Sequence, residues 1–367
     1  MNFKIKKNLL EKHLNIVGKA IDPNNVMMQL RGVLINVYEK EIELIGSDGD
    51  FSIKTTIPVS NDLEIFETGE ALIYFDFFKK SVSKVSGEIT VLMRNNVITL
   101  SSSHTTYDLS LLKNQEYPTP IFSLNGDKVT MNYSDFKEAI NNVIFAISNN
   151  VNEANVRLSS VLLHAKNGFL KFFASDSFRL AKHTAKIEQK VEFEKVIKGR
   201  NIKKMLIDDG NKKIDLYASD TELAFVTRDT IIISKLAEVM YKDYDHLIPN
   251  DFITTITIDK KVIDELINKI FFNSDDKNYR FTLMVENDKI TAKSSVDEIA
   301  KMESLTTEFE LNGQTLEIDF NFNYFKEAIQ VFEKEIVICI GSDLKRVLFI
   351  SKYSPHTQQM VTPLRRI

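Results

Sequence analysis

The chain repeats one pattern three times at a constant spacing, and this repeat limits its fold more than any other feature. Each copy is a short strand-like run, a polar break, and a helix-like run with apolar residues three and four apart. The copies begin near Phe3, Val129 and Thr255, so 126 residues separate each copy from the next. A period close to a third of the 367 residues indicates duplication, and one hydrophobic core stops growing at about 250–300 residues. We therefore predict three similar domains, at residues 1–125, 126–250 and 251–367.

Each third contains the strand-and-helix pattern a second time. The second copies lie at residues 71–85, 195–206 and 315–332. Helices are followed by runs of alternating apolar and polar residues, as at 32–46, 160–174 and 212–227. Such alternation is typical of strands that bury one face, and the one-sided apolar helices should pack on the resulting sheets. The pattern predicts an α+β fold of three domains, each a doubled βαβββ unit.

Four of the strand-like runs end in a small residue followed by Ser and Asp. These triplets begin at Gly46, Ala174, Ala218 and Gly341. Ser and Asp side chains accept hydrogen bonds from nearby backbone N–H groups, so they favour turns. One or two copies would be an ordinary turn signal, whereas four copies at corresponding places support duplication.

The composition is that of an ordinary globular protein, with 43% hydrophobic and 27% charged residues. With 47 basic and 51 acidic residues the formal net charge is −4, which argues against a simple basic coat for nucleic acid. The single cysteine, Cys339, excludes an internal disulfide and a thiolate cluster, which fits a reducing cytoplasm. The N-terminal residues do not resemble a signal peptide, and no apolar run approaches the roughly 20 residues of a membrane span. We expect a cytoplasmic protein with no membrane partner.

Motifs of the common enzyme classes are missing from the sequence. It has neither of the usual glycine-rich phosphate loops, no G-x-S-x-G nucleophile turn and no H-E-x-x-H zinc motif. We therefore predict a protein without catalysis, metal or cofactor. An alternative is a multidomain β-rich enzyme whose site is assembled across domains. Such a site would gather carboxylates with several of His13, His104, His164 and His183.

Lysine and arginine recur on the polar faces of the predicted helices. Cations in such positions suit phosphate contacts that ignore base sequence. However, Lys260 with Asp264 and Lys261 with Glu265 also form ordinary pairs one helical turn apart. The pattern alone leaves DNA contact and a solvated charged face as alternatives.

Several segments together resemble the β sliding clamp family, the processivity subunit of bacterial DNA polymerase III. They are MNFKIKKNLLEKHL, LRGVLINV and LIGSDGD in the first third, VLLHAKNGFLKFFASDSFRLA in the second, SKLAEVMYKDYDHLIP at the joint that follows, and TPLR near the end. SDSFRLA is similar to the family's TDGHRLA, and the resemblance covers essentially the whole chain.

This resemblance implies a head-to-tail homodimeric ring, with helices inside and sheets outside, around double-stranded DNA. The implied partners are the polymerase III α subunit, the clamp loader and other proteins with clamp-binding motifs. Within the family, the alternative is a paralogue specialised for repair or for sequestering a partner.

The resemblance also implies a partner-peptide pocket between the second and third domains. The matching positions are Leu158, Ser175, Ser177, Phe178, Arg179, Leu180, Lys242, Leu247, Met360, Thr362, Pro363, Leu364 and Arg365. Ser177 and Phe178 stand where the family usually has Gly and His. Lys242 stands where proline is common, and Thr362 where an aliphatic residue is usual. We expect these departures to shift the consensus of the hydrophobic peptides that bind.

Further positions are assigned to DNA contact and to the dimer interface. The DNA candidates are Arg200, which matches a basic position of the family, and Lys203, Lys204, Lys12, Lys79 and Lys80. The loop at residues 22–25 lacks an arginine that some family members have there. The interface candidates are Tyr107 and Leu109 in the first domain and Phe271 and Phe272 in the third. The two phenylalanines could equally be core residues.

Overall fold

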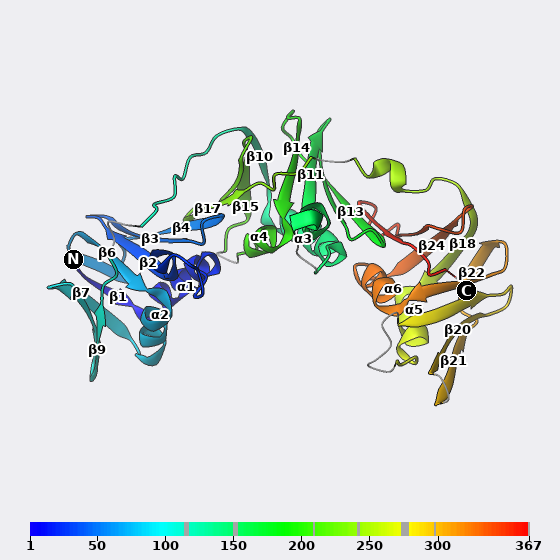
Figure 1. The fold of residues 1–367 in the computed structure, drawn as a ribbon, viewed down its shortest axis with the longest axis horizontal. Helices are drawn as coiled ribbons and strands as arrows, with labels where there is room; N and C mark the ends of the chain where they lie inside the picture. The colour runs from blue at the N-terminus through cyan, green and yellow to red at the C-terminus, as the bar shows by residue number, and fades with distance from the viewer. Residues whose placement is uncertain are drawn as a thin grey trace. The chain divides into compact units, whose positions relative to one another are not determined.

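The fold follows the predicted repeat of strands and helices (Figure 1). The computed structural model describes residues 1–113, 117–149, 153–207, 210–240, 243–272, 279–296 and 299–365. Within these residues a strand leads directly into an α-helix six times. The pairs are β1 (Asn2–Lys6) with α1 (Lys7–Val17), β6 (Gly69–Tyr74) with α2 (Phe75–Lys84), β10 (Asp127–Asn132) with α3 (Tyr133–Val143), β14 (Phe193–Lys198) with α4 (Gly199–Lys204), β18 (Phe252–Asp259) with α5 (Lys260–Asn268), and β23 (Leu316–Asn321) with α6 (Phe322–Gln330). The prediction of two such pairs in each third is confirmed.

A three-stranded antiparallel meander comes after each helix. We call the meanders after α1, α3 and α5 the leading meanders. They are β2 (Gly32–Val37), β3 (Glu41–Ser47) and β4 (Phe51–Pro58); β11 (Ser160–Lys166), β12 (Phe169–Ser175) and β13 (Arg179–Lys186); and β19 (Arg280–Val285), β20 (Ile290–Val296) and β21 (Ala300–Thr306).

The meanders after α2, α4 and α6 are called the trailing meanders. They are β7 (Glu88–Arg94), β8 (Val97–Ser102) and β9 (Thr105–Ser110); β15 (Lys213–Ala218), β16 (Glu222–Val226) and β17 (Thr230–Lys235); and β24 (Glu335–Gly341), β25 (Val347–Ile350) and β26 (Thr357–Val361). Two further short strands are β5 (Leu63–Glu67) and β22 (Glu310–Gly313). Each third is therefore a doubled βαβββ unit, as predicted.

Helices α5 and α6 begin where a polar side chain caps their first turn, and both bury one face. The Asp259 carboxylate accepts a hydrogen bond of 2.8 Å from the backbone N–H of Lys261 at the start of α5. The Asn321 side chain does the same for Tyr324 at the start of α6, at 3.2 Å. Such caps satisfy backbone donors that have no partner in the first turn. The apolar residues of both helices then face the sheets beneath them.

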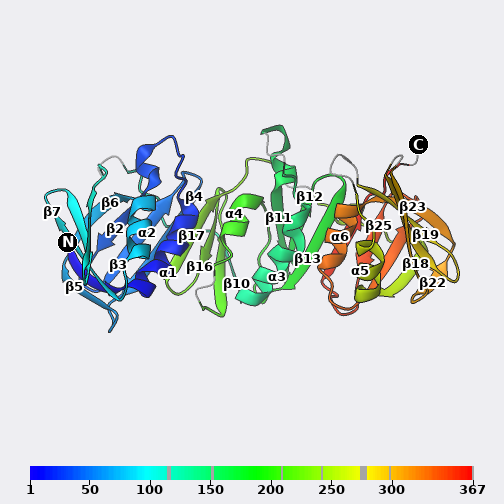
Figure 2. The same ribbon diagram turned by 90° about the horizontal axis from the view of Figure 1, so that it is seen from below.

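The chain divides into two compact units whose boundaries cross the central third. Unit 1 contains residues 1–133 and 200–236, and unit 2 contains residues 134–199 and 237–367. In unit 1, α1 and α2 lie side by side on β2, β3 and β4 (Figure 2). In unit 2, α5 and α6 contact each other and the strands around them.

Each unit contains two antiparallel sheets. In unit 1 the strand orders are β5-β1-β7-β8-β9 and β10-β15-β16-β17-β4-β3-β2-β6. In unit 2 they are β14-β11-β12-β13-β26-β25-β24-β18-β22 and β21-β20-β19-β23. Phenylalanine rings fill the core of unit 2, where Phe325 lies 5.2 Å from Phe281 and from Phe349 between ring centroids.

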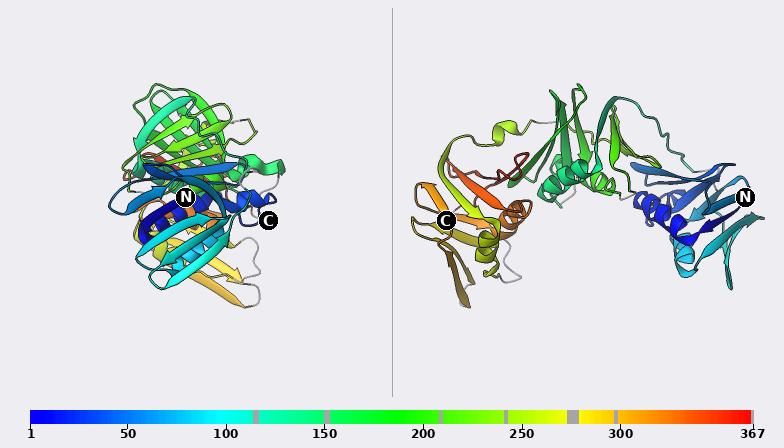
Figure 3. Two further views of the ribbon diagram at one scale, coloured as in Figure 1. Left: turned by 90° about the vertical axis from the view of Figure 1, so that its left-hand side faces the viewer. Right: turned by 180° about the vertical axis from the view of Figure 1, so that it is seen from behind.

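The longer sheet of each unit joins meanders from two different thirds of the sequence. In unit 1, β4 pairs with β17, and Thr55 lies opposite Thr230. In unit 2, β13 pairs with β26, and Leu180 lies opposite Met360. Figure 3 shows the second pairing as the red C-terminal strand beside the green strand β13. Both joints therefore combine the last strand of a leading meander with the last strand of a trailing meander.

None of the helices in the described part of the chain is long and apolar enough to cross a membrane.

Candidate functional site

The turn between β12 and β13 places the central residues of the predicted pocket. The Asp176 carboxylate accepts hydrogen bonds from the backbone N–H groups of Phe178, at 3.0 Å, and Arg179, at 3.1 Å. The equivalent Asp48 accepts from Asp50 and Phe51 at 3.0 and 2.8 Å, so the predicted turn chemistry is confirmed. Because this turn is closed by side-chain acceptors, it holds Phe178 at a fixed place above the sheet.

Ser177 adopts a backbone conformation that favours glycine. Its φ is +80°, and Gly49 has a φ of +96° at the same place in the first third. A side chain is strained in this left-handed region. The replacement of the family's glycine therefore keeps the turn but makes its geometry less favourable.

Arg179 is a buried organising residue of this turn. Its Nε donates to Asp176 Oδ2 at 3.0 Å, and its Nη1 donates to Glu327 on α6. The guanidinium carbon lies 4.5 Å from the ring centre of Tyr324 and 5.5 Å from that of Phe145. Cations stack favourably on aromatic faces, so Arg179 joins β13 to α6 within unit 2.

Phe178 extends this cluster to the surface. Its ring stacks on Tyr324 with a centroid distance of 6.3 Å and an interplanar angle of 22°, yet the residue is 58% exposed. A stacked but exposed aromatic ring presents an apolar face to a ligand. Tyr324 and Glu327 were not among the predicted site residues, because only the fold brings α6 next to this turn. Asp176 was recognised as a turn residue but was not assigned to the site.

The second part of the predicted pocket is the tail, defined here as residues 362–365. Its first backbone N–H, that of Thr362, donates to the carbonyl of Phe178 at 2.8 Å. Beside the tail lies a cavity of about 400 Å³, and four predicted residues line it: Thr362, Pro363, Leu364 and Arg365. The same cavity is lined by Leu316 to Asp319 of β23 and by Leu344 and Lys345. The Thr362–Phe178 hydrogen bond therefore joins the tail to the turn within unit 2, although no residue of the turn lines the cavity.

The other predicted pocket residues that the structure describes do not line this cavity. Leu180 and Met360 are buried opposite each other in the β13–β26 pair, and Ser175 Oγ donates to the Arg179 carbonyl at 2.8 Å. Leu158 and Leu247 are half-buried. Lys242 lies outside the described residues.

The joint that follows the central third is held by charge. Asp245 contacts the amino groups of Lys171 and Lys182, from β12 and β13. Burial acts to raise the pKa of Asp245, but hydrogen bonds from the two lysines lower it below its ordinary value. Nearby, Arg346 Nη1 donates to the carbonyl of Leu247 at 3.2 Å. These contacts fix the segment that carries Leu247.

A buried histidine lies in the β13–β26 pair behind the site. His183 Nδ1 lies 3.0 Å from Thr357 Oγ1 and 3.3 Å from Asn142 Nδ2 on α3. Burial lowers the pKa of His183 from 6.5 to about 4; the nearby charge of His356 acts in the same direction and that of Asp135 opposes it. The folded chain therefore holds a neutral imidazole.

This histidine predicts a pH dependence of stability. Below pH 6.5 the imidazole of the unfolded chain takes up a proton, whereas that of the folded chain does not until about pH 4. The free energy of unfolding therefore decreases as the pH is lowered through this window. Between pH 7.5 and 5 we expect a loss of about 2 kcal/mol from this residue. Urea unfolding of the wild type and His183→Gln at both pH values measures it. The variant should lose less stability on acidification, and an equal loss in both would contradict the prediction.

All six predicted DNA-contact residues belong to unit 1. Lys12, Lys80 and Lys203 are exposed on α1, α2 and α4, and Lys79 lies over the Phe75 ring at 5.6 Å. Lys204 Nζ is 3.1 Å from Asp48 Oδ2, and Arg200 Nη2 is 3.7 Å from Asp50 Oδ2. These ion pairs partly neutralise the two cations, which the sequence alone did not indicate.

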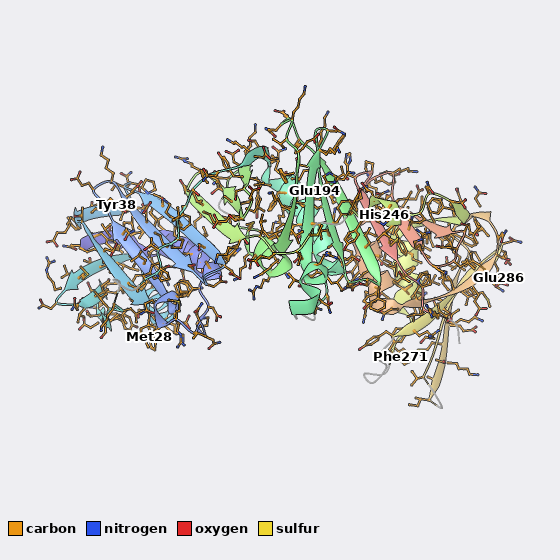
Figure 4. All side chains as sticks on the ribbon, turned by 45° about the horizontal axis from the view of Figure 1, so that its top comes forward. Met28, Tyr38, Glu194, His246, Phe271 and Glu286 are labelled. Carbon is orange, nitrogen blue, oxygen red and sulfur yellow. The ribbon has the colours of Figure 1, made fainter. Side chains whose placement is uncertain are left out.

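The predicted interface residues differ in their surroundings. Tyr107 and Leu109 are half-buried on β9, the end strand of its sheet. Phe271, labelled in Figure 4, is 61% exposed just after α5. Phe272 instead packs against the core of unit 2, with its ring 5.0 Å from that of Phe322. Of the pair, Phe271 is therefore the residue that a partner could contact, and Phe272 is accounted for as a core residue.

Two exposed apolar residues near the end strands were not predicted. Phe77 on α2, which contacts β9, is 64% exposed, and Leu305 is exposed on β21. The sequence did not single them out, because β21 also contains Met302 and because Phe77 lies between Phe75 and Phe78 on α2. Among the residues that the structure describes, no three His, Cys, Asp or Glu side chains lie close enough together to hold a metal ion.

Three family models together match almost the whole chain. The DNA polymerase III beta subunit N-terminal domain matches residues 1–121, its central domain residues 130–243, and its C-terminal domain residues 245–365. The beta sliding clamp of Mycoplasmopsis pulmonis is 28% identical over 373 residues, covering 100% of both chains. That of Staphylococcus aureus is 26% identical over 376 residues, covering 100% of this chain and 99% of its own.

Solved structures show the same fold. A DNA polymerase sliding clamp from Bacillus subtilis superposes with a TM-score of 0.94 at 24% identity, covering 100% of both chains. The beta subunit of the DNA polymerase of Streptococcus pyogenes superposes with a TM-score of 0.93 at 22% identity, again over 100% of both chains.

Proposed function

The chain belongs to the DNA polymerase III beta subunit family, and from this premise we propose that it is a sliding clamp. In this proposal two copies form a closed ring around double-stranded DNA. The ring holds the replicative polymerase and other replication or repair proteins on the template. Tethering of this kind is mechanical and requires no catalytic residue.

The observation that carries the proposal is the strand pairing at the ends of the meanders. Leading meanders end in β4, β13 and β21, and trailing meanders end in β17, β26 and β9. Two of the three possible joints form within the chain, namely β4 with β17 and β13 with β26. In the described residues, β21 and β9 are end strands with one neighbour each. If β9 of one copy pairs with β21 of the other, two chains close into a ring.

Apolar side chains near both end strands support this pairing. Tyr107 and Leu109 lie on β9, and Phe77 lies on the adjacent helix. On the other side, Leu305 lies on β21 and Phe271 follows α5. Exposed apolar residues beside an open strand edge are typical of surfaces that bind another chain.

The charge distribution suits DNA that passes through a ring. Encirclement requires no tight grip, so a net charge of −4 is compatible with it. Exposed cations such as Lys12, Lys80 and Lys203 would contact phosphates without reading bases. Direct binding to short duplexes should therefore be weak and should decrease with salt.

Partner proteins are proposed to bind at the surface made by Phe178 and the tail. The exposed face of Phe178 and the cavity beside the tail suit the hydrophobic side chains of a short peptide. A few hundred Å² of buried apolar area contribute roughly 25 cal/mol per Å², less the cost of ordering the peptide, which gives about micromolar affinity.

The test of the function is retention on closed DNA. After loading by a clamp loader, the protein should remain on nicked circular plasmid during gel filtration and should be lost once the plasmid is cut. The reason is that a topological link has no other exit. Replacing Lys203 with Glu should weaken loading but keep the difference between the two DNA forms. Equal retention on circular and linear plasmid would refute encirclement.

A further inference from the structure

The tail has few backbone contacts for a segment that forms one wall of a binding site. Beyond Val361, the last residue of β26, the Thr362 N–H donates to Phe178 and the Leu364 N–H donates to the Asp319 carbonyl, each at 2.8 Å. The N–H groups of Thr362 and Leu364 thus bind two different neighbours, the turn before β13 and the strand β23. Chain ends held by so few bonds usually fray.

The side chain of Arg280 restrains the end of the tail. The carbonyl oxygen of Arg365 accepts hydrogen bonds from both Nη1 and Nη2 of Arg280, each at 3.1 Å. Arg280 is the first residue of β19. A guanidinium that binds one oxygen through two N–H groups fixes its position and its direction.

The guanidinium is itself held by a buried carboxylate. Arg280 Nη1 donates to Asp319 Oδ2 at 2.7 Å, and Thr282 Oγ1 donates to Asp319 Oδ1 at 2.8 Å. Asp319 is only 5% exposed, and its backbone carbonyl is the acceptor for Leu364. The Asp319 side chain therefore orients Arg280 toward the end of the tail, while the Asp319 carbonyl binds the tail at Leu364.

We propose that Arg280 and Asp319 form a latch that holds the tail in the shape required for partner binding. This inference rests on the proposed peptide site. Arg280 is a positioning residue: it acts on the ligand through Thr362, Pro363 and Leu364, which line the cavity. The expected ligand is the hydrophobic peptide segment of a replication partner.

The test combines two readouts on the full-length protein. In Arg280→Gln, hydrogen–deuterium exchange of the C-terminal segment should accelerate, because the Arg365 carbonyl loses both donors. The affinity for a fluorescein-labelled polymerase peptide with two adjacent hydrophobic residues should fall roughly ten-fold, the factor that one charge-assisted hydrogen bond supplies. Arg280→Lys should be intermediate, because lysine carries the charge without the fork of donors.

Matched variants separate the latch from general damage. Lys289→Gln removes a cation from the turn between β19 and β20, where it pairs with Glu286 at 3.4 Å, and should change neither readout. Arg280→Gln with Asp319→Asn removes both charges, so no buried carboxylate is left unpaired. It should still release the tail.

The outcomes distinguish the latch from the proposed function. Unchanged exchange of the C-terminal segment, or unchanged affinity for the peptide, in Arg280→Gln would overturn the latch. Failure of the wild type to bind the peptide would refute the proposed site. The exchange result would then still decide whether Arg280 holds the tail.

Discussion

Leu109→Asp is expected to convert a dimer of twice 42.1 kDa into folded monomers. Leu109 is half-buried on β9, the end strand that we propose to pair with β21 of the second copy. In a closed ring its side chain would be covered by the partner, so a carboxylate there would lose water without gaining a counter-charge. The cost is about 3–5 kcal/mol at each joint, enough to weaken association more than a hundred-fold. In the monomer the aspartate can stay hydrated, so the fold should survive.

Light scattering at micromolar concentration measures this effect, with circular dichroism as the check on folding. Thr106→Asp is the matched control, because it adds the same charge to the opposite face of the same strand, where the residue is exposed. The control should remain dimeric. A monomeric wild type, or a Leu109→Asp variant that stays dimeric, would remove the basis for the ring. The monomeric variant should also lose its retention on circular plasmid.

The repeat could be predicted from the sequence because its signals are local. In each strand-helix pair, alternating apolar and polar residues are followed by apolar residues three and four positions apart. A short stretch of sequence is enough to recognise either pattern. The Ser-Asp turns are equally local, since Asp176 binds the backbone two and three residues ahead. These local features predicted the number of strand-helix pairs and the strands that follow each helix.

The joints between thirds could not be read in this way. Thr55 and Thr230 lie 175 positions apart, and Arg179 and Glu327 lie 148 apart. An alternating strand has the same pattern whichever strand it pairs with, so its partner is set by the packing of whole meanders. For the same reason the sequence did not show that the Arg280 latch exists.

The resemblance located residues without giving their roles. It placed Arg179 in the wall of the pocket, whereas the structure buries this arginine between two carboxylates and two aromatic rings. Its contribution is therefore to hold Phe178 and Tyr324 in place. Phe271 and Phe272 make the same point, since adjacent identical residues after α5 have opposite environments.

Ending the chain at Val361 is expected to abolish peptide binding and to leave the ring intact. The tail supplies Thr362, Pro363 and Leu364 to the cavity, and its removal leaves an open surface on which a short peptide buries too little area to offset its ordering cost. The tail attaches to β23, the end strand opposite β21 in the four-stranded sheet, so the proposed β9–β21 joint should be unaffected. Removing only residues 366–367 is the matched control and should preserve binding.

A substitution on the other wall tests the same site without shortening the chain. Phe178→Asp is suitable because the residue is 58% exposed, so the aspartate stays hydrated in the free protein and loses its water only when an apolar peptide covers it. Leu180→Asp is less suitable, because Leu180 is 2% exposed and a charge there would disrupt the β13–β26 pair itself. Fluorescence anisotropy of the labelled peptide should show binding lost in both the truncated chain and Phe178→Asp, while light scattering shows dimers in each. If both variants bound the peptide as the wild type does, partners would have to dock elsewhere on the molecule.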